Sequence, residues 1–63
     1  MEFKWVDENN NVISCIEKIK ILNENMAELT QTIKDIHDDA ILMGVSNKNF
    51  KKNIVLLFEQ MFG

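Results

Sequence analysis

Apolar residues recur through the middle of the chain at alternating intervals of three and four positions, beginning at Val12 and continuing to Met43. With Val12 assigned to heptad position a, every a and d position in this stretch is apolar. The a positions are Val12, Ile19, Met26, Ile33 and Ala40, and the d positions are Cys15, Leu22, Leu29, Ile36 and Met43. A sustained heptad of this kind predicts a long helix that packs along one seam against another helix.

The residues that precede the heptad follow a different pattern. Residues 1–5 alternate between apolar and charged, as a short strand does, but a single strand would have no pairing partner in this chain. We therefore expect an extended arm over residues 1–8. Asp and Asn between positions 7 and 11 suit a helix start, because their side chains accept hydrogen bonds from free backbone N–H groups. The long helix is accordingly predicted over about residues 9–43.

A tight corner is predicted directly after the heptad. Gly44 follows the last apolar position and can adopt the left-handed backbone conformation that ends many helices. Ser46 is suited to cap a new helix, since its hydroxyl can accept from a backbone N–H two or three residues later. A second helix is predicted over about residues 47–62. Its packing positions are Phe50, Ile54, Val55, Leu57, Phe58, Met61 and Phe62.

The two predicted helices differ in length, and this mismatch favours association with a second molecule. Folded back at the corner, the short helix covers the long one only from about Met26 to Met43. The uncovered part of the seam, with Met26 at its edge, consists of Val12, Cys15, Ile16, Ile19, Leu22 and Met26. Each large aliphatic side chain left in water forgoes about 1.5–3 kcal/mol, against a total stability of about 5–15 kcal/mol for a folded protein.

The predicted fold class is an all-α helical hairpin that dimerises into an antiparallel four-helix bundle. Neutral residues at the e and g positions favour a bundle over a two-stranded coiled coil, which usually carries charge pairs there. These residues are Asn23, Asn25, Thr30 and Thr32. The alternative to cover by a second molecule is that the arm folds back over the seam with Phe3, Trp5 and Val6. In either case, Trp5 is expected to be a packing anchor for the bundle end or a contact for a partner protein.

Composition and charge exclude several kinds of site and partner. A chain of 63 residues is expected to form one domain, and its one cysteine and one histidine exclude an internal disulfide and a structural zinc site within one chain. The net charge of −3, with seven lysines and no arginine, makes nucleic acid an unlikely partner. No apolar run approaches the ~20 residues of a membrane span, and no signal peptide is evident. We expect a cytoplasmic protein without a cofactor.

Few residues suggest a catalytic or metal-binding function. Asp35, Asp38 and Asp39 share one helical face and are expected to form a solvated acidic surface, although grouped carboxylates can also bind a hard cation. His37, at the edge of the seam, is expected to be structural rather than catalytic, because no nucleophile accompanies it. Cys15 is expected to be a small buried apolar group.

The predicted function is that of a small non-catalytic helical protein–protein interaction module, such as an adaptor, a small chaperone or a regulator. It would self-associate, most simply as a homodimer, and a further protein partner is possible. The alternative is a nucleic-acid-linked regulatory hairpin dimer that uses Lys18, Lys20, Lys34 and the lysines between positions 48 and 52.

Overall fold

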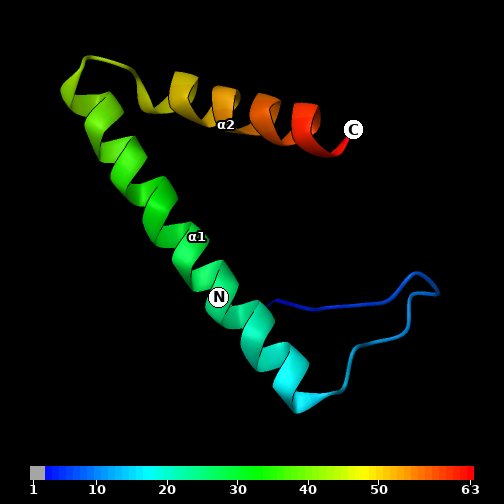
Figure 1. The fold of residues 1–63 in the computed structure, drawn as a ribbon. Helices are drawn as coiled ribbons and strands as arrows, with labels where there is room; N and C mark the ends of the chain where they lie inside the picture. The colour runs from blue at the N-terminus through cyan, green and yellow to red at the C-terminus, as the bar shows by residue number, and fades with distance from the viewer. Residues whose placement is uncertain (1–2) are drawn as a thin grey trace. The chain divides into compact units, whose positions relative to one another are not determined.

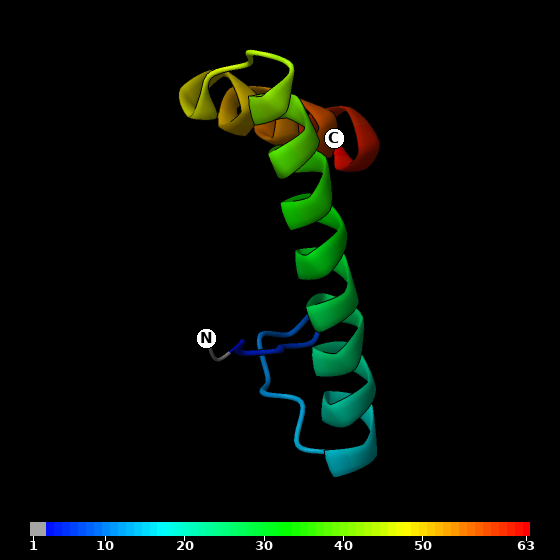
Figure 2. The same ribbon diagram turned by 90° about the vertical axis from the view of Figure 1, so that its left-hand side faces the viewer.

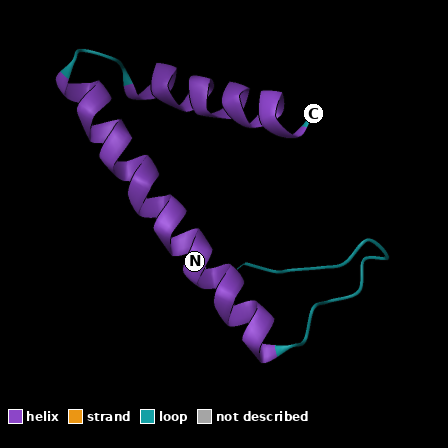
Figure 3. Ribbon diagram, in the orientation of Figure 1, coloured by secondary structure: helices purple, strands orange, loops and turns teal. Residues whose placement is uncertain are grey.

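The computed structural model describes residues 3–63 and contains two helices in that range, α1 (Ile16–Leu42) and α2 (Asn47–Phe62) (Figures 1 and 3). The prediction of an all-helical chain with two helices is confirmed. Residues 3–63 include one isolated bridge but no strand. The chain divides into two compact units, Met1–Gln31 and Thr32–Gly63, which we call the arm unit and the corner unit. That residues 1–63 form a single domain stays a prediction.

Residues 3–15 of the arm unit form a loop that extends away from the start of α1, turns, and returns to the side of that helix (Figures 1 and 2). Asp7 organises the turn, since its Oδ1 accepts from the backbone N–H groups of Asn9 and Asn11, each at 2.9 Å. Asn10 has φ of 65°, a left-handed conformation that asparagine tolerates better than most residues. We call residues 3–15 the arm loop.

Backbone pairing closes the arm loop. Val6 and Val12 form an isolated antiparallel bridge, and the N–H of Ile13 donates to the carbonyl oxygen of Trp5 at 2.8 Å. This isolated bridge lies just after the alternating residues 1–5 and is not a strand. The first two residues of the predicted arm lie outside the described residues.

The predicted start of the long helix at about residue 9 is wrong, because α1 begins at Ile16. The asparagines that suggested a helix start instead form the turn of the arm loop. Asp and Asn side chains offer backbone N–H groups an alternative to helical hydrogen bonds, and here that alternative is reinforced by the pairing of Val6 with Val12. Val12 and Cys15 consequently precede α1.

The corner between the helices has the two local features that the sequence predicts. Gly44 has φ of +95°, and the hydrogen bonds around it follow the Schellman pattern: Gly44 N–H donates to Ile41 and Val45 N–H donates to Ala40, both at 3.0 Å. Ser46 then caps α2, since its hydroxyl oxygen accepts from the N–H of Asn49 at 3.1 Å. These bonds satisfy backbone groups that a helix end leaves without partners.

In the corner unit, α2 covers a different edge of α1 from the one that the heptad suggests. The half-buried residues there are Ile33, His37 and Ala40, at positions a, e and a, whereas Ile36 at position d is 49% exposed. An undistorted helix of 3.6 residues per turn drifts by about 20° per heptad, so a straight neighbour does not follow the a and d positions over several turns.

Candidate functional site

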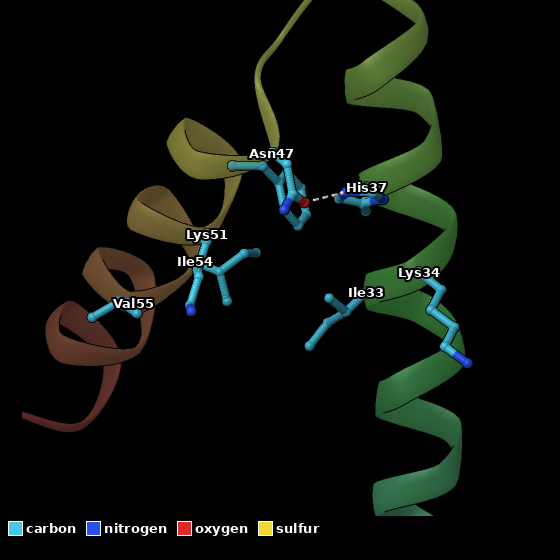
Figure 4. Close-up of a pocket in the computed structure, with 8 residues that line it drawn as sticks. Ile33, Lys34, His37, Asn47, Lys51, Ile54 and Val55 are labelled. Carbon is cyan, nitrogen blue, oxygen red and sulfur yellow. Dashed lines mark hydrogen bonds between the residues drawn. The ribbon is translucent and has the colours of Figure 1, made fainter.

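An open apolar pocket lies in the corner unit, between the last turns of α1 and the first turns of α2 (Figure 4). Its volume is about 300 Å³. The residues that line it are Ile33, Lys34, His37, Asn47, Phe50, Lys51, Ile54 and Val55. Ile33 and Ile54 extend from the two helices toward the space between them, while Lys34 extends along the outside of α1. We call this site the corner pocket.

His37 forms the polar end of the corner pocket. Its Nε2 lies 2.7 Å from Asn47 Oδ1, and because an amide oxygen can only accept, Nε2 donates in this bond. Its Nδ1 lies 3.3 Å from Asp38 Oδ1. The ring also meets Phe50 edge-on, with centroids 5.1 Å apart and planes at 79°. His37 thus links α1 to the first turn of α2 by a hydrogen bond and an aromatic contact.

The chemistry of the corner pocket suits an apolar guest. The residues that line it provide aliphatic and aromatic surface, with the two lysines and the His37–Asn47 pair as its polar groups. No hydroxyl, thiol or carboxylate is among the lining residues. The lining is therefore mainly apolar, with a few polar groups at its edge, as is common for sites that bind an apolar group.

The predicted packing residues of α2 fall into two groups. Phe50 and Ile54, near the start of the helix, are half-buried against the end of α1. The others are exposed: Val55, Leu57, Phe58, Met61 and Phe62. Leu56 is exposed as well. The apolar surface of α2 therefore extends well beyond the part that meets α1 within the corner unit.

The six residues of the predicted self-association seam lie partly in the arm loop and partly in α1. Ile19, Leu22 and Met26 are half-buried on one face of α1, whereas Ile16 is 81% exposed. Val12 and Cys15 lie in the arm loop and are both exposed in the single chain, so the expected burial of Cys15 depends on the predicted self-association. Self-association through these six residues stays a prediction.

Trp5 is attached to α1 in the arm unit. Its Nε1–H donates to Asn23 Oδ1 at 3.0 Å, and its ring lies 5.9 Å from that of Phe3. The indole is half-buried, as is Ile13. The arm loop thus covers part of the seam, which is the alternative that the sequence left open.

The charged residues form no evident metal site. No group of three or more possible ligands is close enough to hold an ion among residues 3–63. Of the three aspartates, Asp38 meets His37, Asp35 has a partner of its own, and Asp39 is exposed. All seven lysines are exposed, at positions 4, 18 and 20 in the arm unit and 34, 48, 51 and 52 in the corner unit.

Comparisons with protein families, with curated proteins and with solved structures give no match for this chain. Neither helix of the described residues is long and apolar enough to cross a membrane.

Sequence reasoning placed His37 at the seam edge but missed its bond to Asn47 and the corner pocket. The residues are ten positions apart and belong to different helices. The two residues meet because α2 packs on the a and e positions of α1. No pattern within either helix predicts which face of α1 is covered.

Proposed function

We propose that this chain is a small non-catalytic helical protein–protein interaction module that associates with a second copy of itself. One observation carries the proposal. No residue among 3–63 is buried, although sixteen large apolar side chains in that range are at least 36% exposed. A folded protein normally removes such side chains from water, and a larger uncovered set is typical of an interaction surface.

Burial of these side chains could contribute a large part of the folding free energy of so small a chain. Burying one large apolar side chain completely contributes about 1.5–3 kcal/mol, and a whole small protein is stable by about 5–15 kcal/mol. Covering even a few of the exposed residues of α2 would therefore add stabilisation comparable to that of the isolated fold. Small chains without a disulfide or a metal commonly gain it by oligomerisation.

The simplest assembly is an antiparallel four-helix bundle of two chains. Each hairpin contributes two helices, and apolar faces left open in one copy are covered by the other. An adaptor, a small chaperone or a regulator would use such a module. The one cysteine of the chain is a free thiol, which is consistent with the reducing conditions of the cytoplasm.

Urea unfolding at two protein concentrations tests the proposal, with circular dichroism as the readout. Between about 5 µM and about 100 µM, a dimer that unfolds to separate chains should gain about 1.8 kcal/mol of apparent stability, which is RT ln 20. Curves that superimpose at the two concentrations would contradict self-association. The same comparison in high salt checks that charge alone does not hold the copies together.

A further inference from the structure

The exposed apolar surface of α2 contains a stripe whose spacing is the same read from either end. Lys51, Val55, Phe58 and Phe62 follow one another at intervals of four, three and four residues. At about 100° per residue these positions lie within one narrow band of the helix surface. Val55, Phe58 and Phe62 are 49%, 36% and 78% exposed. We call these four residues the α2 stripe.

We propose that the α2 stripe packs antiparallel on the same stripe of a second copy, and that Phe62 of each copy enters the corner pocket of the other. The proposal rests on the proposed self-association and specifies its contact. The occupant is α2 of a second copy of this chain.

The spacing supports a two-fold contact. When the stripe is laid antiparallel on itself, position 51 faces position 62 and position 55 faces position 58, and both pairs occur twice. A two-fold interface requires this kind of self-complementary surface, in which each residue and its counterpart exchange places. Apart from Lys51, the positions that meet are apolar.

The corner pocket lies at the end of the stripe that receives Phe62. Lys51 and Val55 line the pocket and also belong to the stripe. The register that places position 62 opposite position 51 therefore brings the most exposed aromatic ring of α2 to an apolar pocket of about 300 Å³. Aromatic residues that fill such pockets commonly anchor protein interfaces.

Charge favours the antiparallel direction. Lys48, Lys51 and Lys52 lie near the start of α2, where positive charge opposes the helix macrodipole, and the last turn of α2 has no basic residue. An antiparallel copy brings its own helix C-terminus, with exposed carbonyl groups and Glu59, beside these lysines. A parallel copy would instead bring three more lysines to the same place.

Disulfide trapping tests the register. One chain carries Lys51→Cys and another Phe62→Cys, each in a Cys15→Ser background, and the two are mixed in a glutathione buffer. In the proposed dimer the two positions of different chains are adjacent. Two copies of position 51, or two of position 62, are about 16 Å apart along the helix axis, and a disulfide needs Cα atoms within about 7 Å.

The expected result is a mixed disulfide at least fivefold more abundant than either symmetric one. Predominantly symmetric disulfides would show a parallel pair and overturn the proposal. Little disulfide of any kind, from protein whose mass remains dimeric, would overturn the stripe contact and leave the self-association intact. An unsubstituted chain that is monomeric would overturn both.

Alanine variants provide a second measurement that does not depend on trapping. Phe62→Ala should raise the dimer dissociation constant at least tenfold, whereas Leu56→Ala should change it less than threefold. Leu56 is also 49% exposed on α2, but its position faces away from the stripe. Circular dichroism checks that both variants keep their helices. Equal effects of the two substitutions would contradict the proposal.

Discussion

The arm unit and the corner unit are stabilised by different kinds of contact. In the arm unit, hydrogen bonds to Asp7 and one indole bond to Asn23 tie a loop without regular structure to a helix. In the corner unit, two capped helix ends turn the chain, and His37 and Phe50 join the helices. Six of the exposed large apolar side chains belong to the arm unit and ten to the corner unit. The corner unit therefore has more apolar surface that a second molecule could cover.

The largest effect is expected from Phe50→Ala, which removes a ring that lines the corner pocket and contacts His37. Complete burial of phenylalanine would make this truncation cost about 3–5 kcal/mol, and the half-buried position of Phe50 reduces the expected loss to about 2 kcal/mol. Urea unfolding followed by circular dichroism measures it. A loss no larger than that of the exposed-site variant Leu56→Ala would show that the helices of the corner unit are not held by this contact.

Gly44→Ala should cost about 1–2 kcal/mol, because a side chain is strained at the φ of +95° found there. Nothing lies within 4 Å of the added Cβ, so the cost is conformational and not a clash. Gly44→Asn provides the control. Asparagine tolerates this conformation, as Asn10 does at φ of 65°, and should lose less than alanine. Thermal unfolding followed by circular dichroism compares the two variants. A larger loss of stability for Gly44→Asn than for Gly44→Ala would contradict the explanation.

Ser46→Ala should cost about 1 kcal/mol and lower Tm by about 4–8 °C, because the first turn of α2 loses the acceptor for the N–H of Asn49. Ser14→Ala is the matched control, since Ser14 is exposed and lies outside both helices. Equal melting temperatures for the two variants would show that the cap does not stabilise the corner unit.

The smallest effect is expected in the arm unit. Asn23→Ala removes the acceptor of the Trp5 indole and should cost about 0.5–1 kcal/mol at this partly exposed site. Trp5 is the only tryptophan, so its fluorescence reports on the arm unit alone. We expect the fluorescence midpoint in urea to fall while circular dichroism changes little. Asn25→Ala, exposed two residues away, should leave both unchanged, and a change of the same size there would exclude a specific role for the indole bond.

Features that depend on a few neighbouring residues could be predicted from the sequence. The corner was predictable because Gly44 and Ser46 act within a few residues of themselves, through helix-end geometry that is nearly independent of the rest of the chain. The start of α2 follows from those signals, and both predicted bounds of that helix are correct. The long apolar repeat likewise predicted a helix that contains all of α1, although it begins too early.

The start of α1 was not predictable from local signals. Asp7 and the asparagines after it fit a helix start and a turn equally well, and the pairing of Val6 with Val12 favours the turn. The candidate site depends on similar non-local choices. The heptad identifies which residues of α1 are apolar, but it does not say which edge α2 covers, and this edge decides whether His37 meets Asn47.

The mass of the chain in solution tests the central claim most directly. Light scattering across a concentration series should give twice the 7.4 kDa of one chain at the upper end, falling toward one chain on dilution. A constant mass of 7.4 kDa at every concentration, with full helical content by circular dichroism, would contradict the account.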